Sequence, residues 1–251
     1  MFTVYLAIAA VFLPLFPMSM IFNNLYARFS TPLPRILFVL CWPQIGLVIL
    51  SLSTSEIPSW IVPWAILTSI LYAWRMLTLR DIGLWIGFMA TSGWSLIWLM
   101  LDDRIAYNEL HVFIIGICLP LVILTMLGAG LSKRYGAAYL GLYGGIADAM
   151  PRFTGIFVVS VLAVIATPLF PAFSLMLYLM LHFLPASPWI AFGIAMIWML
   201  WSWAGARLLS GLIVGESNRS VADISRAVQS SAIVVLIGLV AMALFSLGAM
   251  Q

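Results

Sequence analysis

The feature that most constrains the fold is a run of 33 mostly apolar residues, 152–184, interrupted near its middle by Pro168 and Pro171. One membrane-crossing helix needs about 20 apolar residues. The run therefore predicts either two short crossings or one crossing whose helix is discontinuous. A broken helix frees backbone carbonyl and amide groups within the membrane, where they are tolerated only against protein or a water-filled cavity. Such breaks often mark ion or substrate paths.

The composition indicates an all-α, polytopic membrane helix bundle, because 65% of the residues are hydrophobic and only 8% are charged. The charged residues lie in short segments between apolar runs, so the net charge of +3 does not indicate nucleic-acid binding. Cys41 and Cys118 lie in apolar runs and are expected to be buried thiols. The tryptophans mostly fall near the ends of the runs, as in aromatic belts, and a subset could contact another subunit.

Eight apolar segments are predicted to cross the membrane: 1–22, 36–54, 57–79, 82–101, 110–131, 152–184, 189–214 and 231–250. Pro14 and Pro17 are expected to kink the second half of the first segment. Between the last two segments, a polar stretch is expected to form a short surface helix capped by Ser220 or Asp223. Asp223 is otherwise expected to be a solvated loop charge.

The basic residues predict the topology. If the N-terminus is outside and 152–184 crosses once, ten of the eleven Lys and Arg residues fall on one face, and only Arg104 falls on the other. Two full crossings there would move Arg207, Arg219 and Arg226 to the opposite face. Because cytoplasmic loops are enriched in Lys and Arg, we expect about eight crossings with one discontinuous helix. The expected location is the bacterial inner membrane, with both termini outside.

Five short motifs follow one another between about residue 60 and residue 250: Arg80-Asp81-Ile82, Gly128 to Arg134, Gly144-Gly145-Ile146 with Met150-Pro151, Pro168 to Phe173, and Asp223 to Arg226. In order and spacing they resemble the C-terminal half of the antiporter-like membrane subunits of respiratory complex I, the NuoM and NuoL type. The resemblance implies a six-crossing antiporter-like half over 57–251. It leaves two N-terminal transmembrane helices of unassigned origin over 1–56.

The departures from this family's pattern concern proton transfer. The resemblance implies a path along buried Lys, His and Glu side chains. Counted from the nearest motif, the lysine position falls at Gly83, two histidine positions fall at Gly93 and Ile117, and the glutamate position falls at Met176. Proton transfer needs titratable groups or ordered water between them. We therefore expect a channel scaffold that has lost its channel residues.

Four remaining polar residues are candidates for an ion path or for an interface. His111 could relay protons toward a partner or be a satisfied interfacial histidine, and His182 poses the same choice. Asp148 precedes Met150-Pro151, where an acidic side chain favours a helix N-terminus; it could instead complete a proton path with His111. Arg207 could snorkel to the membrane surface or pair with another subunit.

No nucleophile–base arrangement, nucleotide-binding loop or metal-ligand cluster is recognisable in the sequence, so no catalytic, cofactor or metal residue is assigned. The first hypothesis is a non-catalytic subunit of a proton-motive membrane complex. It would dock or stabilise a larger antiporter-like subunit, or anchor a peripheral catalytic subunit. Candidate hosts are a complex I-like dehydrogenase, a membrane-bound hydrogenase or a DAB-type inorganic-carbon accumulation complex. The alternative is an independent secondary transporter that uses the broken helix as its site. The bilayer is a partner in both cases, and nucleic acid in neither.

Overall fold

The computed structural model describes residues 2–52, 57–102, 107–142, 144–215 and 221–249, and within them every named element is a helix. The elements are α1 (Phe2–Phe12), α2 (Ser19–Arg28), α3 (Pro32–Ser51), α4 (Ile61–Met76), α5 (Ile82–Ser95), α6 (Ile97–Asp102), α7 (Tyr107–Tyr135), α8 (Ile146–Ala149), α9 (Pro151–Val164), α10 (Pro171–Ala186), α11 (Pro188–Ile213) and α12 (Arg226–Ala249). The predicted all-α membrane helix bundle is confirmed.

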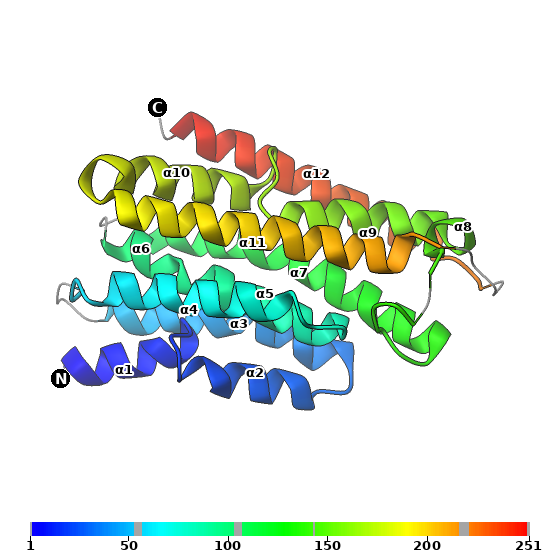
Figure 1. Cartoon of the computed structure of the whole chain (residues 1–251), viewed down its shortest axis with the longest axis horizontal. Helices are drawn as coiled ribbons and strands as arrows, with labels where there is room; N and C mark the ends of the chain where they lie inside the picture. Colours follow the sequence, from blue (N-terminus) through cyan, green and yellow to red (C-terminus); the bar gives the residue numbers. More distant parts are fainter. Residues whose placement is uncertain (1, 53–56, 103–106, 143, 216–220, 250–251) are drawn as a thin grey trace.

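Five helical segments of the described chain are long and apolar enough to cross a membrane: Pro32–Ser51, Ile82–Leu101, Glu109–Tyr135, Pro188–Ile213 and Arg226–Phe245. The helices run roughly along the long axis of the bundle, and α1 begins at the same end at which α12 finishes (Figure 1). That placement agrees with an even number of passes. The count of eight crossings and the side of the membrane on which the termini lie stay predictions.

The first predicted span is not one kinked helix. Segment 1–22 contains α1 and the start of α2, with a non-helical connection around Pro14 and Pro17, because proline lacks the N–H that continues a helix and its ring clashes with the preceding turn. The freed carbonyl groups are satisfied by indoles of neighbouring helices. Trp98 Nε1 donates to the Leu13 carbonyl at 2.9 Å, and Trp64 Nε1 donates to the Phe16 carbonyl at 2.7 Å.

The N-terminal helices belong to the same core as the rest of the chain. α3 packs on α1 and α7, α2 packs on α5, and one buried apolar cluster extends from Leu6 to Leu239. A boundary at residue 56 therefore stays a prediction from the sequence motifs. Cys118 is buried and its thiol donates to the Val39 carbonyl at 3.2 Å. The expectation that Cys41 is buried is wrong, because it lies on the exposed face of α3.

The polar stretch before the last helix also differs from expectation. Residues 221–225 are not helical, and α12 runs without interruption from Arg226. The separate surface helix predicted there is therefore wrong for these residues, and the proposed cap Ser220 lies outside the described residues.

Candidate functional site

The discontinuous helix of segment 152–184 is built from α9 and α10. α9 ends at Val164, α10 begins at Pro171, and the connection passes through two residues with left-handed backbone, Ala166 (φ 60°) and Leu169 (φ 82°). Left-handed backbone is uncommon for residues other than glycine. Trp198 Nε1 of α11 donates to the Ala166 carbonyl at 3.1 Å. The break is thus held by a side chain of the neighbouring helix, as at the α1–α2 connection.

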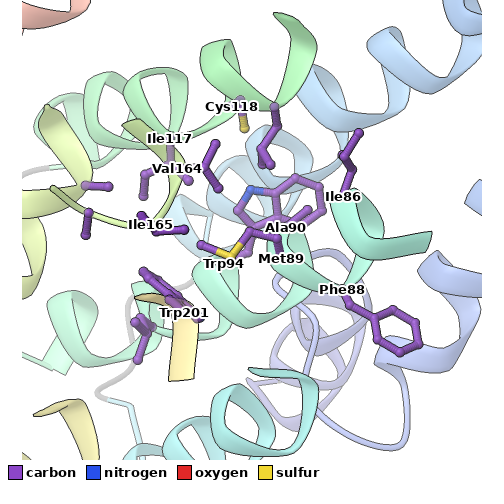
Figure 2. Packing of buried hydrophobic residues seen from close by; sticks show 14 of the residues in the cluster. Ile86, Phe88, Met89, Ala90, Trp94, Ile117, Cys118, Val164, Ile165 and Trp201 are labelled. Atoms are coloured by element: carbon purple, nitrogen blue, oxygen red, sulfur yellow. The ribbon is translucent and has the colours of Figure 1, made fainter. Parts of the chain in front are cut away.

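Apolar side chains pack around this break. Val164 and Ile165 at the end of α9 are buried, and Met176 of α10 is fully buried. Figure 2 shows Val164 and Ile165 close to Ile117 of α7, with Trp201 of α11 nearby. The backbone groups of the break therefore meet protein on these sides, which satisfies the requirement for irregular backbone at membrane depth.

The structure brings together two of the positions at which the motif spacing predicts lost channel residues, Gly93 and Ile117. A Cβ added to Gly93 of α5 would lie 3.6 Å from Cγ2 of Ile117 and 3.9 Å from the Trp201 ring. Ile117 lies in the apolar cluster of Figure 2, which includes the fully buried Trp94 next to Gly93 in sequence. Met176 lies on α10, and Gly83 lies separately at the start of α5. The space between α5 and α7 is filled by hydrocarbon at this point.

The buried polar side chains are all neutral. In the part of the chain that the structure describes, the ten buried polar residues are all serine or threonine, and no Asp, Glu, Lys, Arg or His side chain is buried. One group of hydrogen-bonded side chains joins the three helices α4, α5 and α11. Ser92 Oγ of α5 lies 2.9 Å from Ser69 Oγ of α4 and accepts a hydrogen bond from Trp201 Nε1 at 2.8 Å. Hydroxyl groups can bond to water, but they do not titrate near neutral pH.

His111 is partnered within the chain. Its Nδ1 pairs with Oε1 of Gln44, and Gln44 Nε2 donates to the His111 carbonyl at 3.3 Å. The imidazole of α7 is therefore tied to α3. His182 is exposed on α10, where its ring stacks on Tyr178 with centroids 6.0 Å apart.

Asp148 on α8 and Arg207 on α11 are both exposed. The four candidate residues therefore sit on four different helices, α7, α8, α10 and α11. Among the described residues, no group of three or more His, Cys, Asp or Glu side chains could hold a metal ion. The structure does not assemble these candidates into one site.

The acidic cap of α9 is not predicted by the sequence. Asp223, in the segment before α12, accepts hydrogen bonds from the backbone N–H groups of Arg152 at 2.8 Å and Phe153 at 3.0 Å. These are N–H groups that the first turn of a helix leaves unpaired. The N-cap residue Met150 makes no side-chain cap. Asp223 is thus not simply a solvated charge, and it ties α9 to the approach to α12.

Comparisons with known proteins identify the fold. No family profile and no curated protein sequence matches the chain. One similar solved chain belongs to respiratory complex I from Thermus thermophilus with bound NADH, at 18% identity and a TM-score of 0.81, with 96% of this chain and 54% of that chain covered. A chain of the Mrp complex from Dietzia sp. DQ12-45-1b matches at 16% identity and a TM-score of 0.79, covering 94% of this chain and 54% of its own length.

A third similar chain comes from the membrane-bound sulfane sulfur reductase, an archaeal respiratory membrane complex, at 16% identity and a TM-score of 0.79, with 94% and 51% covered. At these identities the likeness establishes the fold, which is that of the antiporter-like membrane subunits. The resemblance inferred from the motifs is confirmed at that level. The present chain spans about half the length of the chains it matches.

Proposed function

We propose that the chain is a non-conducting membrane subunit of an energy-coupled, proton-motive complex. The observation that supports this most directly is that no Asp, Glu, Lys, Arg or His side chain is buried in the described part of a fold of this type. A proton path needs titratable groups or ordered water between them. Ile117 and Met176, where the motif spacing places channel residues, are buried among apolar side chains. The broken helix then serves as packing architecture.

A larger antiporter-like subunit is the partner we propose, because the similar solved chains are parts of multisubunit membrane complexes. The arrangement of tryptophans supports a docking surface. Five are buried, and the five that are exposed all lie on or just before two helices that pack against each other, α4 and α11. We call this surface the tryptophan face; its exposed members are Trp60, Trp64, Trp74, Trp189 and Trp203.

Aromatic residues are enriched at the core of protein interfaces. On α11 the exposed side chains Trp189, Phe192, Met199 and Trp203 recur at spacings of three, seven and four residues, which places them along one stripe of the helix. A stripe of this kind suits the packing of a transmembrane helix from a partner.

Co-purification tests the proposal. The tagged chain, extracted in mild detergent, is expected to carry a larger antiporter-like chain in stoichiometric amount. The double variant Trp189→Leu/Trp203→Leu is expected to lose that chain. The matched control Ile237→Ala/Leu244→Ala, which alters exposed apolar residues of α12, is expected to retain it. A lone monomer or homo-oligomer that transports an ion would refute the proposal.

The co-purifying chains also decide between hosts. A complex I-like dehydrogenase, a membrane-bound hydrogenase and a DAB-type inorganic-carbon complex would each bring a different peripheral catalytic subunit.

We also propose that the chain lies in the bacterial inner membrane with both termini outside. A reporter fused after residue 251, active only outside the cytoplasm, tests it: an inactive but folded fusion would contradict the orientation.

One observation favours the alternative of an independent transporter. Ser174, three residues after Pro171 on α10, is buried, and its hydroxyl has no hydrogen-bond partner within the described structure. A small ion or substrate at the break would supply that partner. If the purified chain transports a solute and Ser174→Ala abolishes the transport, the alternative holds.

A remaining conduction path through His111 and Asp148 would be detected as reduced coupling of the intact complex when both are changed to alanine.

A further inference from the structure

A pocket of about 730 Å³ lies between the end of α2, the start of α3, the start of α5 and the second half of α7. It is separate from the α9–α10 break and from the apolar cluster around Trp94. Three charged side chains line it: Arg35 of α3, Asp81 before α5 and Lys133 of α7. Two are cationic and one is anionic, so the pocket carries a net positive charge.

The arginine is held in position across the start of α5. Arg35 Nε donates to the Phe29 carbonyl at 2.8 Å, and its guanidinium carbon lies 5.3 Å from the centroid of the Tyr26 ring. A Cβ at Gly83 would come within 2.6 Å of Arg35 Nη1, so the guanidinium fits here only because residue 83 has no side chain. The two terminal nitrogens of the guanidinium have no hydrogen-bond partner among the described contacts.

The carboxylate in the pocket, that of Asp81, already accepts a hydrogen bond within the chain. Asp81 Oδ1 accepts a hydrogen bond from the Leu84 N–H at 2.7 Å and caps α5. Lys133 lies in the last turn of α7 and is exposed. An anion entering the pocket would thus meet Arg35 and Lys133 without displacing an internal salt bridge of Asp81.

The remaining walls are apolar or carry hydroxyl groups. Leu33 and Met126, which line the pocket, are 65% and 53% exposed, so apolar side chains flank its opening. At the inner end the Tyr26 hydroxyl lies 3.4 Å from Thr125 Oγ1. Cations next to an apolar opening, at the end of a membrane helix bundle, match the amphiphilic character of a lipid.

We propose that this pocket binds an anionic phospholipid, with the phosphate on Arg35 and Lys133 and an acyl chain along Leu33 and Met126. A guanidinium presents a fork of donors that suits phosphate oxygens, and basic side chains near the membrane surface attract anionic lipids. The helix ends that contain these residues belong to the face that the charge distribution predicts to be cytoplasmic. The inference does not depend on the proposed function, because it concerns the isolated chain.

Native mass spectrometry of the purified full chain in neutral detergent tests the proposal. We compare binding of phosphatidylglycerol, phosphatidylcholine and inorganic phosphate. The wild-type chain is expected to prefer phosphatidylglycerol over phosphatidylcholine by about fivefold or more for each basic side chain engaged. Arg35→Gln/Lys133→Gln is expected to lose this preference. Arg75→Gln/Arg207→Gln, two exposed arginines outside the pocket lining, is expected to keep it.

Arg35 also contacts Phe29 and Tyr26, so its substitution could destabilise the chain. A second variant that leaves Arg35 unchanged is therefore required. Lys133→Glu changes an exposed side chain and is expected to reduce phosphatidylglycerol binding by more than the charge-neutral Lys133→Gln. Equal binding of the two lipids, or equal loss in the Arg75→Gln/Arg207→Gln control, would overturn the proposal. Inorganic phosphate that binds alone and competes fully with phosphatidylglycerol would show a soluble phosphate ligand, and the lipid assignment would be wrong.

Discussion

Removing the carboxylate of Asp223 is expected to destabilise the chain more than any other exposed or half-exposed acidic change in the described structure. The two side-chain oxygens accept N–H groups of Arg152 and Phe153 from α9, and Oδ1 also accepts the Ile224 N–H at 2.7 Å. Asp223→Ala leaves the first turn of α9 without a cap. The nearest acidic alternative, Asp148, is exposed on α8 and makes no cap to α9.

The magnitude follows from the two interactions that are lost. Loss of an N-cap costs about 1 kcal/mol, and loss of a negative charge at a helix N-terminus costs about 0.3–1 kcal/mol. Together they predict a loss of about 1.3–2 kcal/mol in the free energy of unfolding for Asp223→Ala. For a chain of this size that corresponds to a fall in Tm of about 3–8 °C. Asp223→Asn keeps one acceptor oxygen and is expected to lose about half as much.

Thermal unfolding of the purified chain in one detergent, followed by intrinsic tryptophan fluorescence, measures these differences. Asp148→Ala is the matched control, and we expect its Tm to lie within about 1 °C of wild type, as for a surface substitution. If Asp148→Ala lowers Tm as much as Asp223→Ala does, or if Asp223→Ala leaves Tm unchanged, the assignment of the α9 cap is wrong.

Four further variants test the packing and the predicted loss of the relay. Trp201→Phe removes the 2.8 Å hydrogen bond to Ser92 Oγ and is expected to cost about 1–2 kcal/mol, measured as a lower Tm; an unchanged Tm would contradict it. Gly205→Ala places a Cβ 2.8 Å from Ile165 and is expected to cost about 1–3 kcal/mol by overpacking. Gly155→Ala, where a Cβ meets nothing within 4 Å, is expected to be neutral or to stabilise α9 by up to about 1 kcal/mol, so equal losses in both would refute the packing account. Introducing titratable side chains at the four predicted channel positions is not expected to create proton flux in liposomes, because the apolar side chains around Ile117 and Met176 stay in place. The combined substitutions are Gly83→Lys, Gly93→His, Ile117→His and Met176→Glu.

The fold class could be predicted because apolar run length and charge spacing report directly on membrane crossing. Pro168 and Pro171 also predict a break in the helix, because proline cannot continue a helix. The same signal at Pro14 and Pro17 predicts only a kink when the sequence is considered alone. What decides between a kink and a break there is whether neighbouring helices supply donors, and Trp64 and Trp98 are remote in sequence.

The cap of α9 and the pocket could not be predicted for the same reason. Asp223 and the N–H groups it accepts are about seventy residues apart, and no local pattern connects them. Arg35 reaches Gly83 only because α3 and α5 begin beside each other around the pocket. The motif spacing predicts the positions of lost channel residues, but it does not show that Gly93 and Ile117 lie next to each other, which the structure does.

The most direct test of the central claim is proton flux through the purified chain alone, reconstituted in liposomes with a pH-sensitive dye inside. With an interior whose buried polar side chains are serine and threonine in the described part, we predict a rate equal to that of protein-free liposomes under an imposed pH gradient. Flux clearly above that rate, abolished by changing a single internal side chain, would contradict the account.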